Sequence, residues 1–354
     1  MKKLVICCDG TWNRADQQAN GSPCPTNVVK MAYRIAKRAD KDTPQVIYYH
    51  EGVGTGNALD RYTGGAFGDG LEANIYDAYR FLVANYEDGD DIYIFGFSRG
   101  AFTARSIVGM IRNCGILKRE SVNQYSAAVA MYHDHQHGPD DPVALEFRKA
   151  HSVCGEREVP VKFIGVWDTV GSLGIPLRGL RWMTRKDYQF HDTRLSKIVE
   201  HAYHALAIDE RREPFQPTLW QYTPREGQQV EQVWFAGVHS DVGGGYPETG
   251  LSDVALDWMI GKARDAGLVF DAKTLLTFGL RANFAAAAHD SRSTLYKITR
   301  PVDRAIGLCA DGQPDPTQSV HPSVLERWDR DRGYRPSGLL AWLQRRKDAR
   351  VAGA

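Results

Sequence analysis

The clearest pattern along the chain is a series of short apolar runs that end in polar or glycine-rich turns. Runs without polar alternation are typical of strands that are buried on both faces of a parallel sheet. The pattern predicts buried strands over Lys3–Cys8, Gln45–His50, Asp91–Phe97, Val161–Trp167 and Gln232–Val238.

Helical periodicity fills the intervals between these runs. Residues 99–114 and 253–266 read as helices, and apolar residues recur at helical spacing after Gly70. The apolar face of that segment consists of Leu71, Ile75, Ala78 and Leu82. Apolar strands that alternate with helices indicate an α/β fold, with a mostly parallel central sheet covered by helices on both faces.

Two regions depart from the alternation. Residues 119–158 combine helical patterns with polar, histidine-containing loops, and we expect a helical insertion over the site. Residues 267–354 are less regular, with proline-rich turns and helices outside the core. Because no stretch reads as a linker, we predict one domain over residues 1–354.

Composition excludes several classes of protein. The 44 basic and 43 acidic residues give a net charge of +1, so no nucleic-acid partner is expected. The six cysteines lack CxxC spacing and read as free, buried thiols. The N-terminus does not resemble a signal peptide and no apolar run is long enough to span a membrane, so we expect synthesis in the cytoplasm.

Chemically competent side chains follow the predicted strands. Ser98, Asp168 and His239 each stand at or just after the end of a run, in that chain order. Because the carboxyl ends of parallel strands share one edge of the sheet, we expect these side chains to meet. A serine, a base and an orienting acid form the triad that cleaves acyl esters, and the order Ser, Asp, His is that of α/β-hydrolases.

Ser98 lies in the stretch GFSRG, between a strand and a helix. G-x-S-x-G at such a junction is the nucleophile elbow, whose tight turn requires the flanking Gly96 and Gly100. The structural alternative is a glycine-flanked turn in which the serine only caps the helix.

His239 is the leading candidate for the base, because it ends a strand and opens a glycine-rich loop. His289 and His321 are competitors from the less regular C-terminal region. Asp168 is the leading acid and Asp209 the second choice. Asp241 is too near His239 in sequence to fold back onto its imidazole, and we expect it to have a supporting role.

An oxyanion hole requires two donors. The N–H of Arg99, the residue after the nucleophile, is one of them. The loop at Gly10 and Thr11 is the best source of the other, with Asp9 holding that loop through backbone N–H groups. The stretch CDGT also resembles an aspartate-nucleophile phosphatase motif, but Cys7 stands where that nucleophile should be.

Five sequence blocks together resemble an uncharacterised α/β-hydrolase family that includes the catalytic domain of type VI secretion phospholipase effectors. The blocks are CDGTWN, GFSRGAFTAR, GVWDTVGSLG, ALAIDERREPFQPTLW and WFAGVHSDVGGGY. The resemblance implies that Ser98 is the nucleophile, Asp168 the acid and His239 the base. It also implies ester or phospholipid substrates, no cofactor, and export by a system that does not need a signal peptide.

The sequence therefore predicts a serine carboxylester hydrolase. Two alternatives stay open: a binding or toxin-associated protein with an idle site, and a metal-dependent hydrolase that uses Asp9, Asp168, His239 and Asp241. Residues 338–350 place leucines and a tryptophan before a basic cluster. This segment is expected either to pack on the domain as a helix or to lie on an anionic membrane surface.

Overall fold

A seven-stranded sheet forms the centre of the computed structural model, in the order β4-β1-β5-β6-β7-β8-β9. The structure describes residues 1–52, 64–134, 136–171, 194–223, 225–277, 279–292 and 300–352. Every neighbouring pair of strands in this sheet is parallel. The strands are β1 Lys3–Cys8, β4 Gln45–His50, β5 Asp91–Phe97, β6 Val161–Trp167, β7 Val199–Ala207, β8 Gln229–Phe235 and β9 Gln318–Val320.

The helices surround this sheet, and a short hairpin of β2 (Gln18–Ala19) and β3 (Ser22–Pro23) lies apart from it. The helices are α1 Asn27–Ala32, α2 Gly64–Asn85, α3 Arg99–Cys114, η1 Arg119–Gln124, α4 Tyr125–Tyr132, α5 Pro142–His151, η2 Glu213–Phe215, α6 His239–Gly243, α7 Gly250–Asp265, α8 Ala272–Thr277, α9 Pro322–Arg330 and α10 Ser337–Ala352.

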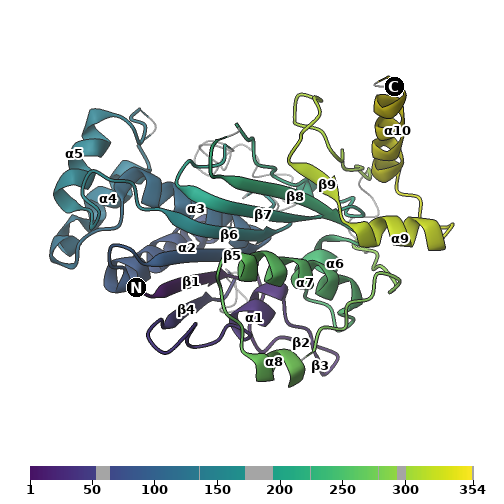
Figure 1. Cartoon of the computed structure of the whole chain (residues 1–354), viewed down its shortest axis with the longest axis horizontal. Helices are drawn as coiled ribbons and strands as arrows, with labels where there is room; N and C mark the ends of the chain where they lie inside the picture. The colour runs from purple at the N-terminus through teal and green to yellow at the C-terminus, as the bar shows by residue number, and fades with distance from the viewer. Residues whose placement is uncertain are drawn as a thin grey trace.

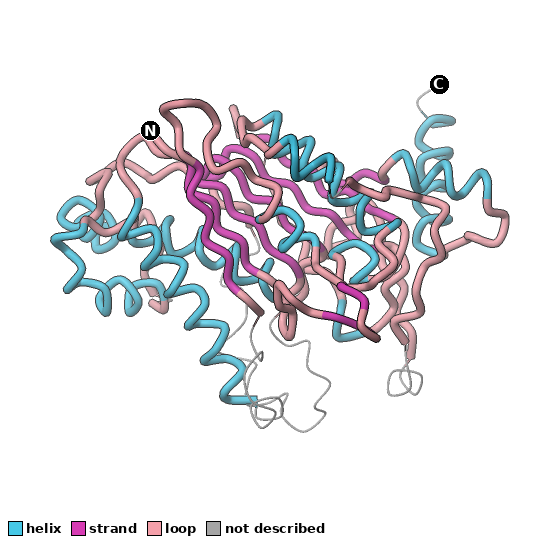
Figure 2. The backbone as a smooth tube through the Cα atoms, turned by 90° about the horizontal axis from the view of Figure 1, so that it is seen from below, coloured by secondary structure: helices cyan, strands magenta, loops and turns pink. Residues whose placement is uncertain are grey.

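Alternate residues of each strand supply the cores on the two faces of the sheet. In β1, Leu4 and Ile6 pack toward α2 and α3, whereas Val5 and Cys7 pack toward α1 and α7. Figure 2 shows the resulting layers, with helices on both sides of the strands. Burial of each of the aliphatic side chains among them, Leu4, Val5 and Ile6, stabilises the fold by roughly 1.5–3 kcal/mol. The predicted α/β-hydrolase-like architecture is thus confirmed.

Two strands of the seven-stranded sheet, β7 and β9, were not predicted from the sequence, because their residues are not uniformly apolar. β7 contains Glu200, His201 and His204, yet its central position leaves His204 fully buried. The short β9 pairs with β8 at the edge of the sheet. The strand predicted over 232–238 begins earlier, at Gln229, and ends at Phe235.

The helices of residues 119–151 do not lie over the carboxyl edge of the sheet, where the sequence prediction placed them. In Figure 1, α4 and α5 lie beside the amino ends of the strands, and α6 lies at the opposite end. The reason is the direction of α3, which runs back along the sheet and delivers the chain to the amino ends. There, Arg148 of α5 donates to the carbonyls of Arg112 and Asn113 at the end of α3.

The C-terminal segment 338–350 belongs to α10, which packs on the domain. Leu339 and Trp342 are buried in a third apolar cluster with residues of β8 and α9, whereas Leu340 is 53% exposed. Contact of this helix with a membrane surface stays a prediction. Among the described residues, no helix is both long and apolar enough to cross a membrane.

Gly100 shows how closely α3 approaches β1. A Cβ atom at this position would lie 2.2 Å from the carbonyl oxygen of Cys8 and 2.4 Å from that of Asp9. We therefore expect Gly100→Ala to lower the free energy of unfolding by about 2 kcal/mol or more, because backbone must move to make room. Urea unfolding followed by circular dichroism measures the change.

Gly261 in α7 provides the matched control. A Cβ atom there meets nothing within 4 Å. Since alanine is the better helix former, Gly261→Ala should stabilise the protein by roughly 0.5–1 kcal/mol. Equal effects of the two substitutions would contradict the tight contact between α3 and β1.

Candidate active site

Ser98 occupies a strained turn between β5 and α3. Its backbone has φ 58° and ψ −121°, in a region that residues with a Cβ rarely adopt. The side chain makes no capping hydrogen bond to α3, so the alternative of a simple helix-capping serine finds no support. Gly96 is required by the same turn, because a Cβ there would lie 2.4 Å from the carbonyl oxygen of Gly100.

Asp168 and His239 are brought together at the carboxyl ends of β6 and β8. Nδ1 of His239 lies 2.5 Å from Oδ2 of Asp168. Asp168 is fully buried and His239 is 4% exposed. Because an ionised carboxylate only accepts hydrogen bonds, Nδ1 carries the proton of this bond and Nε2 is the nitrogen that points away from Asp168.

Aromatic rings and an acidic residue hold His239 in place. Its ring lies 4.6 Å from that of Phe97, the residue before Ser98, and 5.0 Å from that of Phe215. Its backbone N–H donates to Glu210, which Arg212 binds in turn. Burial lowers the pKa of His239, and the hydrogen bond and charge of Asp168 oppose this only in part.

Arg304 binds the other side of Asp168. Its guanidinium donates to Oδ1 at 2.6 Å and to Oδ2 at 3.0 Å, and the side chain is fully buried. Burial alone would raise the pKa of Asp168, but the charge of Arg304 and the hydrogen bond from His239 hold it well below its usual range. Sequence reasoning missed this arginine, because it stands in an irregular segment with no motif around it.

The loop after β1 supports the site differently from the prediction. Asp9 fixes the loop as expected, since Oδ1 accepts the N–H of Gly10 at 2.7 Å and Oδ2 accepts the hydroxyls of Thr26 and Tyr49. The N–H of Gly10 is therefore already engaged and is not available to an oxyanion. The hydroxyl of Thr11 is buried and has no hydrogen-bond partner in the described part of the chain.

Arg99, the other predicted oxyanion donor, begins α3 directly after Ser98. Its guanidinium lies 5.4 Å from the ring centroid of Trp12, which is 50% exposed. The side chain of Arg99 is thus directed to the loop after β1, while its backbone N–H belongs to the first turn of the helix.

The remaining predicted residues form separate hydrogen bonds around this core. Asp241 accepts the N–H of Val238 and pairs with His289, whose Nδ1 lies 2.6 Å from its Oδ1. Asp209, the second choice for the acid, accepts the N–H of Gly237 and the hydroxyl of Tyr334. His321 caps α9 and is bonded to Ser323.

The metal-dependent alternative required a shared site for Asp9, Asp168, His239 and Asp241. The structure divides them among three networks: Asp9 with hydroxyls, Asp168 with His239 and Arg304, and Asp241 with His289. Across the described ranges, no group of three or more His, Cys, Asp or Glu side chains is arranged to hold a metal ion.

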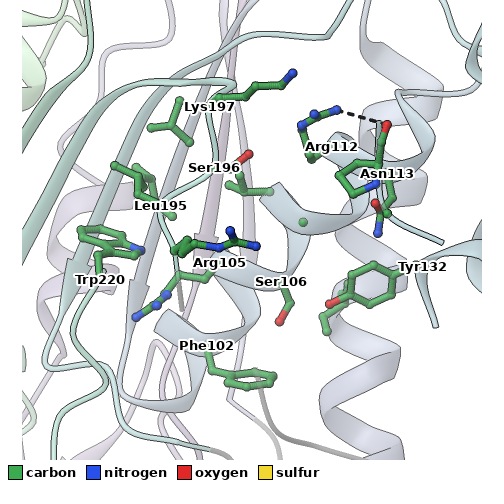
Figure 3. Close-up of a pocket in the computed structure, with 18 of the residues that line it drawn as sticks. Phe102, Arg105, Ser106, Arg112, Asn113, Tyr132, Leu195, Ser196, Lys197 and Trp220 are labelled. Atoms are coloured by element: carbon green, nitrogen blue, oxygen red, sulfur yellow. Dashed lines mark hydrogen bonds between the residues drawn. The ribbon is translucent and has the colours of Figure 1, made fainter. Parts of the chain in front are cut away.

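A cavity of about 900 Å³ lies beside α3, on the face of the sheet that also carries α2. Figure 3 shows Phe102, Arg105 and Ser106 of α3 directed toward it, with Leu195 and Trp220 on another wall. Phe102 follows Ser98 by one helical turn. Ser98, Asp168 and His239 themselves are not among the described residues that line this cavity.

Comparison with known proteins agrees with the resemblance seen in the sequence. Residues 2–262 match a family model described as the catalytic domain of Tle1-like phospholipase effectors of the type VI secretion system. The chain belongs to this family. The family match contains Ser98, Asp168 and His239, whereas Arg304 and His289 lie beyond it.

Several individual proteins are similar to this member of the Tle1-like family. An uncharacterized protein of Saccharomyces cerevisiae, YEL023C, is 33% identical over 236 residues, which cover 60% of this chain and 32% of that protein. The chain thus spans about a third of the length of this relative.

Two solved structures are similar at lower sequence identity. An uncharacterized protein from Pseudomonas aeruginosa is 17% identical, with a TM-score of 0.46 over 79% of this chain and 49% of that one. The Tle1 effector bound to the VgrG spike of the type VI secretion system is 20% identical, with a TM-score of 0.39 over 69% of this chain and 51% of that one.

Asp9 generates a prediction about stability and pH. Burial raises its pKa to about 6, although hydrogen bonds from Thr26 and Tyr49 work in the opposite direction. Between pH 4 and pH 6 the unfolded chain loses this proton and the folded protein keeps it, so the carboxyl group destabilises the fold as pH rises. The folded protein loses about 3 kcal/mol over this interval.

Asp9→Asn removes this dependence. The free energy of unfolding of the variant, measured in urea at pH 4 and at pH 7, should improve relative to wild type at the higher pH. Asp40→Asn is the control. The backbone N–H of Asp42 lowers the pKa of the exposed Asp40 carboxyl, so its effect on stability should change with pH in the opposite direction. A wild-type profile parallel to that of Asp9→Asn would contradict the assignment.

Proposed function

We propose that the chain hydrolyses the acyl ester bonds of phospholipids, with Ser98 as nucleophile, His239 as base and Asp168 as the orienting acid. The observation that supports this most directly is the buried hydrogen bond between His239 and Asp168 at the sheet edge that also presents Ser98. Membership of the Tle1-like family supports the class of substrate.

The arrangement suits a reaction in two halves. Ser98 Oγ attacks the acyl carbonyl carbon while Nε2 of His239 accepts the hydroxyl proton, and His239 then gives that proton to the departing lysophospholipid oxygen. Water, deprotonated by His239, attacks the acyl carbon; the bond from that carbon to Ser98 Oγ breaks, His239 returns the proton to Oγ, and the fatty acid leaves. Asp168 stabilises the imidazolium that forms in each half and fixes which ring nitrogen carries the proton.

The oxyanion in this proposal is held by the backbone N–H of Arg99 together with Thr11. The first turn of α3 presents the Arg99 N–H at the positive end of the helix dipole. The buried hydroxyl of Thr11 is a second donor, since its atom lacks a partner within the described chain. Gly10 contributes shape rather than a donor, because its N–H is bound to Asp9.

Substitution of the nucleophile tests the reaction. Ser98→Ala should lower the release of fatty acid from phosphatidylglycerol and phosphatidylethanolamine vesicles by roughly three or more orders of magnitude. Mass spectrometry of the lysophospholipid product measures the loss. Ser121→Ala, a buried serine of η1 at the other end of the sheet, is the matched control and should retain wild-type activity.

A fluorophosphonate probe separates this proposal from a binding protein with an idle site. The activated serine of the wild type should be labelled covalently, and Ser98→Ala should not be labelled. Vesicle binding without labelling or lipid hydrolysis would instead favour the binding protein, and hydrolysis that survives Ser98→Ala would refute the mechanism.

The pH dependence of the reaction follows from the burial of His239. The base must be neutral to accept a proton, and burial lowers its pKa below the ordinary value of 6.5. The acid limb of kcat/KM should therefore have its midpoint below pH 6.5. A profile measured between pH 4 and pH 9 with a short-chain ester, which avoids changes in the vesicle, checks this; a midpoint above pH 6.5 would contradict it.

A further inference from the structure

Asp168 accepts four hydrogen bonds, and two of them come from one arginine. Oδ1 is bound by Arg304 and by the N–H of Ala207, and Oδ2 is bound by Arg304 and by His239. We propose that Arg304 is a positioning residue for the reaction: it fixes the plane of the Asp168 carboxylate and thereby sets the proton affinity of His239. This inference rests on the proposed function of the triad.

The geometry of the contact favours orientation over simple charge neutralisation. A planar guanidinium that binds both oxygens of a carboxylate prevents the carboxylate from rotating, which a single point charge does not do. The arginine is itself immobile, because its remaining contacts are the carbonyl oxygens of Ala207 and Phe215 and its side chain is fully buried. Oδ2 is consequently held in line with Nδ1 of His239.

The charge of Arg304 has a second effect. An imidazolium at His239 is stabilised by the negative charge of Asp168, and a cation on the same carboxylate offsets part of that stabilisation. Burial is the main cause of the lowered pKa of His239, and the charge of Arg212 acts in the same direction; the inferred effect of Arg304 adds to these through its contact with Asp168. Arg304 thus keeps the base neutral and the acid ionised at the same pH.

Other titratable groups lie around the pair formed by Asp168 and His239. The carboxylates among them, Glu210 and Asp241, are each bound by a partner. Glu210 lies against the backbone of His239 and is bound by Arg212. Asp241, on the helix of His239, is bound by His289. His204 lies behind Asp168, where its Nε2 accepts the N–H of Thr169, and burial lowers its pKa to about 3.

Three acidic groups at or beside the site also receive a partner from the C-terminal part of the chain. His289 binds Asp241, Ser291 binds Glu210, and Arg304 binds Asp168. All three donors lie beyond residue 262, where the family match ends. The family core therefore supplies the three catalytic candidates, and the following segment supplies the guanidinium that binds Asp168 and partners for two carboxylates beside it.

Two substitutions of Arg304 and one control test the inference. Arg304→Met removes both the charge and the two-point contact of the guanidinium with the Asp168 carboxylate. Arg304→Lys keeps the charge but cannot bind both oxygens in the same planar geometry. Arg148→Met is the matched control, because Arg148 is equally buried but its described hydrogen bonds go to backbone carbonyls, two at the end of α3 and one at Pro139, away from the candidate site. Thermal unfolding establishes that each variant is folded before its kinetics are compared.

The first readout does not depend on catalysis. The imidazole of His239 is titrated by NMR in protein labelled with ¹⁵N-histidine, and its signals are assigned by their loss in His239→Asn. Arg304→Met should raise the midpoint by about one pH unit or more. Arg304→Lys and Arg148→Met should leave it close to wild type.

The second readout is the pH profile of ester hydrolysis. Arg304→Met should move the acid limb of kcat/KM upward by the same amount and lower kcat by up to about 100-fold with little change in KM. Arg304→Lys should lower kcat without moving the limb. If Arg304 were only structural, its variants would lose stability as Arg148→Met does, with no shift of either midpoint, and that result would overturn the inference.

The two readouts separate the failure of this inference from the failure of the proposed function. A wild-type protein that hydrolyses no ester refutes the function, and the NMR midpoint still decides whether Arg304 controls His239. Should Arg304→Met not fold, the NMR and kinetic comparison of Arg304→Lys with wild type decides instead, and a wild-type kcat in that variant refutes the role of the two-point contact.

Discussion

The candidate active-site edge of this protein depends on one buried carboxylate, Asp168, whose oxygens are taken up by hydrogen bonds. Asp168 has no exposed surface, and the guanidinium of Arg304, the imidazole of His239 and the N–H of Ala207 take up its acceptor positions. A carboxylate in such a position is costly unless it is fully paired. The network that makes its burial tolerable also contacts His239, so the stability of this edge and the proposed chemistry depend on the same contacts.

The sheet makes this network possible because it is parallel throughout. Parallel strands release their following loops at one edge, so the turns after β5, β6 and β8 converge although Ser98, Asp168 and His239 are far apart in sequence. The tight contact of Gly100 with the end of β1 sets the distance between α3 and the sheet. The position of Ser98 at the start of that helix is therefore fixed from two sides.

Sequence patterns were sufficient for the part of the fold in which residues act through periodicity. β1, β4, β5, β6 and α3 have the predicted bounds, because short apolar runs that end in turn residues are typical of strands in a parallel sheet and the longer apolar run of 99–114 is typical of a buried helix. β7 was missed because polar residues such as His204 are tolerated only after tertiary contacts satisfy them. The direction of α3, which sends residues 119–151 to the amino ends of the strands, is likewise a property of packing and not of local sequence.

The candidate triad could be chosen from strand ends, but its supporting contacts could not. The role of Asp9 followed from a local rule, since a carboxylate in a tight loop binds the neighbouring N–H. Arg304 and His289 are ordinary polar residues in an irregular segment, and only the folded chain brings them to Asp168 and Asp241. Contacts across such long sequence separations leave no periodicity from which to predict them.

The separation of 136 residues between Asp168 and Arg304 has a consequence for the order in which the protein assembles. During synthesis the strands and the turn that carry Asp168 leave the ribosome well before residue 304 does. Until then, the Asp168 carboxylate lacks the cation that makes its burial favourable, so we expect it to stay hydrated. We therefore expect the edge that carries Ser98, Asp168 and His239 to be completed late in synthesis, because a nascent chain that stops short of residue 304 lacks the guanidinium that binds Asp168.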